Sequence, residues 1–296
     1  MIEVLKKVQK RKKCTFDDIP CKNNEFMTKI RDKTVLITGG AAGIGRLMGD
    51  MCLQEGAKQL VIWDIDKDRL DETTREFLTL HFVVHPYIVD VSDLEQVIVM
   101  AGKVRNEVGE VDILINNAGI ITGNHNFRDF THALVDKTMA VNANAMMHVT
   151  LEFLPAMIGK GSGHIVNVSS AAGMLSNPMM SVYCASKWAV AGWSEALRIE
   201  LESSHTGVRV TTVNPSYINT GMFSGVRVNP VMPILKPEIL AGKVIRAIKH
   251  NRLFVRAPFM VKILPFTKGI LPVRWFDLIV GRWLGVYRSM MGFKGR

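Results

Sequence analysis

The segment SVYCASK, residues 181–187, places a tyrosine four residues before a lysine. On a helix, Tyr183 and Lys187 would project from the same face, because positions i and i+4 are neighbours. A phenol has a pKa near 10, and a nearby ammonium group lowers that pKa. The spacing therefore predicts that Tyr183 exchanges protons near neutral pH, assisted by Lys187. The alternative is a half-buried tyrosine beside a solvated lysine. Cys184 is expected to be a small apolar filler.

Apolar runs and amphipathic segments alternate along most of the chain. The runs that predict buried strands are KTVLITGG, QLVIWD, FVVHPYIVD, VDILINNAG, GHIVNVSS, VRVTTVNPS and RLFVRAP. The segments that predict helices are 44–55, RLDETTREFLTL, 93–108, 131–158, 181–203 and 237–250. This alternation is typical of an α/β fold with one doubly wound parallel sheet and helices on both faces. Ligands of such sheets bind at the carboxyl ends of the strands.

The segment TGGAAGIG, residues 38–45, follows the first predicted strand and begins a helix. Glycines 39, 43 and 45 allow a tight turn and a close approach of the backbone to a pyrophosphate. The helix N-terminus that includes Ile44 offers free N–H groups and a partial positive charge. We therefore expect a dinucleotide cradle; the alternative is a glycine-rich turn without a ligand.

Acidic residues end the second and third predicted strands. Asp64 lies nineteen residues after Gly45, where a carboxylate accepts hydrogen bonds from the adenosine ribose. A 2′-phosphate would meet like charge there, so NAD is expected rather than NADP. Arg46 could contact phosphate or solvent. Asp90, with Val91, could contact adenine, or Asp90 could be a helix N-cap.

Taken together, these motifs resemble the short-chain dehydrogenase/reductase family. The matching pieces, in the order typical of the family, are TGGAAGIG, NNAG at 116–119, Asn142, Ser170, YCASK and NPSYINT at 214–220. The resemblance implies a Rossmann-type fold and an NAD(P)-dependent oxidoreductase. One departure is Pro215-Ser216, where the family usually has Pro-Gly.

The resemblance also implies roles for individual residues. Tyr183 would exchange the proton, Lys187 would lower its pKa and hold the nicotinamide ribose, and Ser170 would bind the substrate oxygen. Asn142 would support a water chain from Lys187 to solvent. The remaining expected cofactor contacts are Asn117, Ala118, Gly119, Pro215, Ile218 and Thr220. Ser169 is adjacent to Ser170, and the spacing to the tyrosine favours Ser170.

Within the family, LITGGAAGIGR, WDID, NNAG and INTGMF are most similar to the retinol and 17-beta-hydroxysteroid dehydrogenase branch, including types 11 and 13. That branch acts on lipophilic alcohols and carbonyls. Methionine suits an adaptable apolar pocket. The expected substrate contacts, besides Ser170, are Met174, Met180, Met222 and Phe223. The alternative for some of them is core or subunit packing. Members of the branch often carry an apolar N-terminal anchor, whereas this chain has a basic arm.

Positive charge is concentrated near the ends of the chain. The net charge is +10, and residues 252–296 hold nine lysines and arginines against Asp277 alone. Their interleaving with aromatic and aliphatic residues favours a membrane or lipid-droplet surface over nucleic acid. The alternative is a C-terminal extension that packs over the pocket or against a second subunit.

These patterns predict three parts: a basic arm at 1–32, a catalytic domain at 33–256 and a basic apolar extension at 257–296. Four scattered cysteines favour reduced thiols and an intracellular, cytoplasmic location, peripheral on a membrane if the extension binds lipid. The eight histidines show no ligand spacing, so no metal is expected. The resemblance implies a homodimer or homotetramer that packs through the helices at 131–158 and 181–203. The second function considered is a nucleotide sensor or lipid-surface scaffold with a vestigial site.

Overall fold

A computed structural model of the chain describes residues 27–221, 225, 233–290 and 293. Most of the basic arm predicted at 1–32 therefore lies outside the described residues, as do Met222 and Phe223.

One parallel sheet of seven strands forms the centre of the fold. Its order is β3-β2-β1-β4-β5-β6-β7, so the direction of strand addition reverses between β1 and β4. The strands are β1 Thr34–Thr38, β2 Gln59–Asp64, β3 Val84–Ile88, β4 Ile113–Asn116, β5 Gly163–Val168, β6 Val208–Pro215 and β7 Phe254–Ala257. The doubly wound α/β fold predicted from the sequence is confirmed. The reversal point is where such sheets bind ligands.

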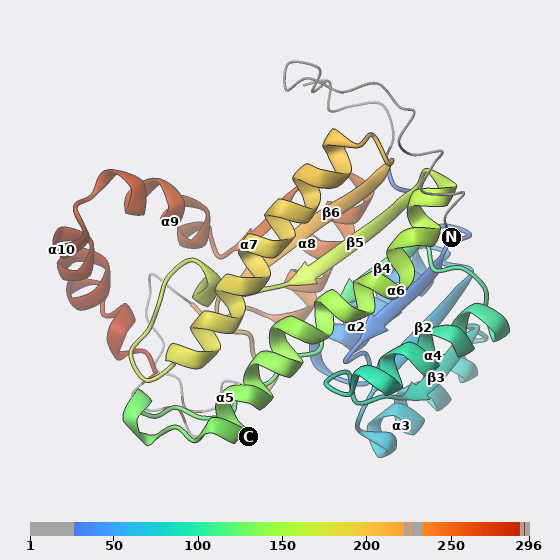
Figure 1. Cartoon of the computed structure of the whole chain (residues 1–296), viewed down its shortest axis with the longest axis horizontal. Helices are drawn as coiled ribbons and strands as arrows, with labels where there is room; N and C mark the ends of the chain where they lie inside the picture. The colour runs from blue at the N-terminus through green and yellow to red at the C-terminus, as the bar shows by residue number, and fades with distance from the viewer. Residues whose placement is uncertain (1–26, 222–224, 226–232, 291–292, 294–296) are drawn as a thin grey trace.

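The strands are apolar on both faces because helices cover both faces. In β1, Val35 and Ile37 pack into one core and Leu36 into the other. The first core includes side chains from α2 (Gly43–Gln54), α3 (Lys67–Thr79) and α8 (Pro237–Lys249). The second includes side chains from α4 (Leu94–Glu107), α6 (Ala145–Lys160) and α7 (Ser181–Ser203). Figure 1 shows α4, α6 and α7 across the near face of the sheet.

The helix predicted at 131–158 is interrupted. It consists of α5 (His132–Met139), a π-helical turn η3 (Ala140–Asn144) and α6. The side chain of Asn142, inside this turn, hydrogen-bonds both backbone groups of Ile120. A π-turn inserted into a longer helix often marks a functional position, and this one carries a predicted site residue.

Short helices complete the chain. Two 3₁₀ turns, η2 (Phe127–Asp129) and η4 (Ala171–Gly173), lie in the loops after β4 and β5. After β7 come α9 (Phe259–Ile270), α10 (Val273–Phe276), a π-helix η5 (Asp277–Trp283) and a 3₁₀ turn η6 (Val286–Arg288). Figure 1 shows α9 and α10 to one side of the sheet, beyond α7.

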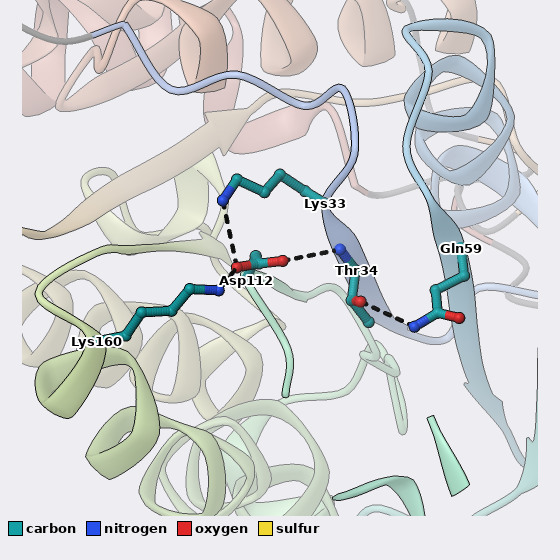
Figure 2. Close-up of polar contacts among 5 residues, drawn as sticks. All are labelled: Lys33, Thr34, Gln59, Asp112 and Lys160. Carbon is teal, nitrogen blue, oxygen red and sulfur yellow. Dashed lines mark hydrogen bonds and ion pairs between the residues drawn. The ribbon is translucent and has the colours of Figure 1, made fainter. Parts of the chain in front are cut away.

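A polar network closes the amino-terminal end of the sheet. Asp112, directly before β4, accepts a hydrogen bond from the Thr34 N–H at 3.0 Å and pairs with Lys33 at 3.5 Å and with Lys160. Gln59 donates to the Thr34 hydroxyl at 3.0 Å. Figure 2 shows how these side chains join the starts of β1, β2 and β4 to the end of α6. The network lies at the opposite end of the strands from the predicted site.

Candidate active site

A long groove runs along the carboxyl ends of the strands. Its lining includes the following cofactor contacts expected from the sequence: Gly39, Gly43, Ile44, Asp64, Asp90, Val91, Asn117, Ala118, Gly119, Tyr183, Lys187, Pro215, Ile218 and Thr220. Gly39 and Gly43 have φ of 63° and 57°, a region that L side chains rarely adopt. Glycine avoids the backbone strain that most other residues would have at these two positions, where the loop turns into α2.

Gly45 is the exception among the expected cofactor contacts. It lies outside the groove lining, and a Cβ at this position would be 2.1 Å from the carbonyl oxygen of Gly39. Its role is to let α2 pack closely against the loop. Asn117 reinforces the same turn by donating from Nδ2 to the carbonyl oxygens of Thr38 and Gly39, at 3.1 and 2.9 Å.

Asp64 connects the end of β2 to the glycine loop. Its Oδ2 accepts a hydrogen bond from the Ala41 N–H at 2.9 Å and its Oδ1 accepts from the Asp66 N–H at 3.1 Å. Each carboxylate oxygen keeps a second lone pair for a ribose hydroxyl. The loop geometry, the start of α2, which lies in the groove without a side-chain cap, and this carboxylate fit a dinucleotide cofactor.

The structure decides the open alternatives for Arg46 and Asp90. Arg46 pairs with Glu76 on α3 and does not line the groove. Asp90 accepts hydrogen bonds from the N–H and hydroxyl of Ser92, whereas the N-cap of α4 is Asp93. The N-cap alternative for Asp90 is therefore wrong, and Asp90 is left facing the groove.

Two basic residues that line the groove were not among the cofactor contacts predicted from the sequence. Arg69 lies in the first turn of α3 and Lys137 lies in α5, and both line the groove. Arg69 Nε pairs with Asp66 at 3.2 Å. Arg69 comes five residues after Asp64, a short distance along the chain that could have indicated a cation beside the predicted ribose site.

Tyr183 and Lys187 share one face of α7, as their spacing predicted. Tyr183 is 8% exposed and Lys187 4%. Lys187 Nζ donates to the carbonyl oxygen of Val168 at 3.0 Å and lies 5.8 Å from the centre of the Tyr183 ring. The alternative of a solvated lysine is therefore wrong. The ammonium group lies at the end of β5, on the floor of the groove.

In the protein without bound ligand, the expected lowering of the Tyr183 pKa is wrong. Burial raises the pKa of the Tyr183 phenol to about 12, and a hydrogen bond with the Ser170 side chain opposes that rise. Burial lowers the pKa of Lys187 to about 8. The sequence argument considered the attraction between the two groups but left out desolvation, which disfavours the charged form of each.

Ser169 and Ser170 are distinguished by their hydrogen bonds. Ser169 Oγ donates to the carbonyl oxygen of Lys187 at 2.8 Å and so fixes α7 to the end of β5. Ser170 Oγ accepts from the Ala172 N–H at 3.1 Å and approaches the carbonyl oxygen of Pro215 at 3.5 Å. Because this second contact is weak, the Ser170 hydroxyl can instead donate to the Tyr183 phenol, with which it also interacts, or to a ligand.

Both the oxygen and the nitrogen of the Asn142 side-chain amide are hydrogen-bonded within the protein. Oδ1 accepts from the Ile120 N–H, and Nδ2 donates to the Ile120 carbonyl oxygen and to Ser186 Oγ. A Cβ on Gly119 would lie 3.3 Å from Asn142 Oδ1 and 3.4 Å from Lys187 Nζ. Asn142 and Lys187 therefore flank the same glycine. The water chain expected from the resemblance stays a prediction.

A smaller cavity adjoins the groove at Tyr183. Met180, as expected, lines it. Met174 does not line the cavity but packs with the residues after β7, and its carbonyl oxygen accepts from Lys268 at 3.2 Å, so its expected contact with substrate stays a prediction. The other lining residues are Ser170, Ala171, Ala172, Leu175, Asn177, Tyr183, Cys184, Ser216, Tyr217, Val286 and Met290.

The residues after β7 form one wall of this cavity. Val261, Leu264, Phe276, Val280 and Val286 pack with Ala171 and Leu175. Hydrogen bonds hold the end of this segment: Asn124 Nδ2 donates to the Met290 carbonyl oxygen at 2.7 Å, and the Tyr217 and Ser289 hydroxyls lie 2.6 Å apart. Packing over the pocket, one of the alternatives raised for this extension, is confirmed. Sequence patterns gave no sign that Val286 and Met290 would reach the site.

The outer side of the same segment is apolar and exposed. Phe266, Val273 and Trp283 are 70, 75 and 74% exposed, and Lys262, Lys268, Arg274 and Arg282 are interspersed with them along the chain. Among the described residues, no helix has both the length and the uninterrupted apolar character needed to span a bilayer.

Comparison with known proteins agrees with this geometry. A family model described as short chain dehydrogenase matches residues 33–230. The chain is 40% identical over 273 residues to epidermal retinol dehydrogenase 2 of Mus musculus, covering 90% of this chain and 87% of the relative. It is 35% identical over 268 residues to estradiol 17-beta-dehydrogenase 11 of Rattus norvegicus, covering 90 and 89%.

Solved structures of the same fold include complexes with both nicotinamide cofactors. A short chain dehydrogenase/reductase from Burkholderia phymatum in complex with NAD superposes with a TM-score of 0.74 at 26% identity, covering 86% of this chain and 97% of that one. A metagenomic short-chain oxidoreductase in complex with NADP superposes with a TM-score of 0.65 at 26% identity, covering 77 and 95%.

Proposed function

Because the chain belongs to the short-chain dehydrogenase/reductase family, we propose that it transfers a hydride between NAD(H) and a lipophilic alcohol or carbonyl through Ser170, Tyr183 and Lys187. One observation carries this proposal. The hydroxyls of Ser170 and Tyr183 lie where the dinucleotide groove meets the apolar cavity, with Lys187 beside Tyr183. A substrate oxygen at this junction would meet both hydroxyls.

Each of the three side chains has a distinct task in this reaction. The bound nicotinamide supplies the hydride acceptor in alcohol oxidation and the hydride donor in carbonyl reduction. Ser170 holds the substrate oxygen by a hydrogen bond. Tyr183 takes the hydroxyl proton of the alcohol or gives a proton to the carbonyl oxygen. Lys187, when charged, favours the phenolate that oxidation requires.

The decisive experiment measures NADH formation at 340 nm with retinol, estradiol and a long-chain primary alcohol, and NADH consumption with the corresponding carbonyls. We expect turnover with at least one pair and its loss in Tyr183→Phe. Activity that survives in Tyr183→Phe would refute the Ser-Tyr-Lys mechanism.

NAD is proposed over NADP because of charge at the end of β2. Asp64 and Asp66 both line that end of the groove, and the nearby cation, Arg69, is paired with Asp66. A 2′-phosphate would therefore meet two carboxylates. The test compares kcat/KM for the two cofactors in the wild type and in Asp64→Ser. We expect a preference for NAD that shrinks in the variant; a wild-type preference for NADP would contradict the assignment.

A lipophilic substrate is proposed because the surface of the cavity is mostly apolar. Leu175, Met180, Val286 and Met290 provide apolar contacts. The names of the relatives indicate retinoids and steroids as their substrates. Turnover of a polar sugar alcohol in preference to all three lipophilic probes would contradict this substrate class.

A second copy of the chain is proposed as a partner. Exposed apolar residues on the outer faces of α6 and α7, including Leu151 and Trp188, support a homodimer or homotetramer through these helices. Light scattering of the purified chain tests this, and a monomer at micromolar concentration would contradict it.

The segment after β7 is proposed to bind an anionic lipid surface. The proposed location is intracellular: cytoplasmic, and peripheral on a membrane or lipid droplet. The exposed aromatic residues and the cations of the segment suit a bilayer interface. The test is flotation with phosphatidylserine-containing liposomes, in which Phe266→Ser/Trp283→Ser should float less than the wild type. Equal flotation of the two proteins would refute the membrane proposal.

A nucleotide sensor or lipid-surface scaffold with a vestigial site is the function less well supported. Such a protein has no need for a buried lysine beside a buried tyrosine, because burying a charge is unfavourable. Cofactor binding without turnover of any probe would favour the sensor, and absence of cofactor binding would contradict both functions.

A further inference from the structure

Three side chains line both the cofactor groove and the substrate cavity, and all three end in a hydroxyl. They are Ser170, Tyr183 and Ser216. The first two have roles in the proposed reaction. Ser216 has none, although it occupies the same junction.

The hydroxyl of Ser216 is buried and lacks a partner within the protein. The residue is 6% exposed, and its Oγ has no hydrogen-bond partner among the described residues. Its backbone is fixed, because its N–H donates to the carbonyl oxygen of Ala257 on β7 at 2.8 Å. A buried hydroxyl without a partner destabilises the fold, a penalty that alanine or glycine would avoid. Such a group at a cavity wall indicates a ligand that provides the missing partner.

The surroundings identify the partner as an oxygen of the substrate. Ser216 follows Pro215, whose carbonyl oxygen is 3.5 Å from Ser170 Oγ, so the two serines are neighbours across the junction. Ala172 and Met180 are apolar and offer no strong hydrogen bond, and the polar pair Asn177 and Tyr217, which also lines the cavity, is hydrogen-bonded at 3.0 Å without reaching Ser216 Oγ. A carbonyl oxygen has two lone pairs, and a serine hydroxyl can rotate to donate to one of them.

We infer that Ser216 donates a hydrogen bond to the reacting oxygen of the substrate, beside Ser170 and Tyr183. This inference rests on the proposed dehydrogenase function. It adds a third hydroxyl beside that oxygen, which accepts hydrogen bonds from all three as it gains negative charge during the reaction. It also gives a physical reason for serine at a position where a side chain without a polar group would be more stable in the free protein.

The test compares Ser216→Ala and Ser216→Gly with Ser194→Ala as a matched control. Ser194 is also a buried serine, but its Oγ accepts a hydrogen bond from Asn167 Nδ2 at 3.0 Å inside the fold. Three quantities are measured for each full-length protein: the midpoint of thermal unfolding without ligands, the dissociation constant of NADH, and kcat/KM with retinol, estradiol and a long-chain primary alcohol.

We expect Ser216→Ala to unfold no earlier than the wild type, because no internal hydrogen bond is lost, whereas Ser194→Ala unfolds earlier. NADH binding should stay within about twofold, and kcat/KM should fall about tenfold for the best probe, as expected for the loss of one hydrogen bond. Ser216→Gly should show the same loss.

Three results would overturn the inference. Unchanged kcat/KM in both Ser216 variants would show that the hydroxyl does not act on the substrate. A loss that appears equally in NADH binding would assign the hydroxyl to the cofactor. Earlier unfolding of Ser216→Ala, as large as in the control, would show an internal structural role. A wild type inactive on every probe would instead reject the proposed function, and this inference with it.

Discussion

Asp112, directly before β4, and Lys187, on α7, are both charged side chains inside the fold, at opposite ends of the sheet. Asp112 has two cationic partners and a backbone N–H donor. Lys187 has a hydrogen bond to the Val168 carbonyl oxygen, and none of the ion pairs among the described residues includes it. The charge of Asp112 is thus compensated by opposite charges of the protein, whereas that of Lys187 is not.

The pKa values of the two groups express this difference. For Asp112, burial by itself raises the pKa, but hydrogen bonds from Lys160 and the Thr34 N–H, with the charges of Lys160 and Lys33, leave the pKa below its usual value. For Lys187, burial alone lowers the pKa to about 8. The comparison teaches that the amino-terminal end of the sheet is built for stability, whereas the carboxyl end keeps a poorly solvated charge, as expected of a functional site.

The largest expected effect is on catalysis. Tyr183→Phe should lower kcat about 100- to 10,000-fold, because it removes the acid–base group. NADH binding, measured by fluorescence, should be retained, because the ring is kept. Asp112→Asn serves as the control at the other end of the sheet, with kcat close to that of the wild type. Equal losses in both variants would contradict the division of roles.

Lys187→Met should separate activity from stability. Since the folded-state pKa of Lys187 is lower than the unfolded value, the charged form destabilises the fold, fully so below pH 8 and progressively less between about 8 and 10.5. The variant should therefore be more stable by about 1–3 kcal/mol at pH 7. It should also be inactive, because it lacks the ammonium group that is proposed to assist Tyr183. Urea unfolding at pH 7 and pH 10 measures the stability. A variant less stable than the wild type at pH 7 would show that Lys187 is compensated after all.

The effect of Asp112→Asn on the free energy of unfolding should be opposite in sign to that of Lys187→Met. The folded-state pKa of Asp112 is lowered, so its contribution is present above the unfolded pKa and is lost as pH falls through the folded pKa. At pH 7 the variant should lose about 1–2 kcal/mol, allowing for the partial exposure of the two lysines. Urea unfolding from pH 7 to pH 2 should show the two proteins converging in acid. A constant difference over that range would refute the ionic explanation.

Lys33→Met should have the smallest effect. Lys33 is 3.5 Å from Asp112 Oδ1 and its side chain is 33% exposed, so solvent screens the pair. We expect a loss of about 0.5 kcal/mol or less in urea unfolding at pH 7. The matched change, Lys160→Met, should be more harmful: the Lys160 side chain is 47% exposed, but it hydrogen-bonds Asp112 and lowers the Asp112 pKa more than Lys33 does. The reverse order would contradict the ranking of the two ion pairs.

Much of the fold could be predicted from the sequence because its signals are local. The run QLVIWD coincides with β2, and the segment 181–203 coincides with α7. The break at Ala140–Asn144 was not predicted, because it depends on hydrogen bonds between Asn142 and Ile120, which belong to distant segments. The residues expected to contact the cofactor, apart from Gly45, line one groove because parallel strands bring their carboxyl ends to one edge.

Predictions about the substrate side were weaker. Met180 was correctly placed in the cavity and Met174 was not, although both lie within ten residues of Tyr183. Apolar residues suit a core, a subunit contact or a pocket equally well, so their type does not identify their location. Val286 and Met290 reach the cavity only through the path of the chain after β7.

The sequence by itself determined the alternation of strands and helices, the glycine loop and the shared helix face of Tyr183 and Lys187, since these follow from short-range spacing and backbone geometry. Only the tertiary structure decided that Gly45 packs behind the loop, that the last helices cover the smaller cavity and that Ser216 lines it. It also decided the direction of the Tyr183 pKa, because desolvation depends on every segment that packs around a group and not on its neighbours in the sequence.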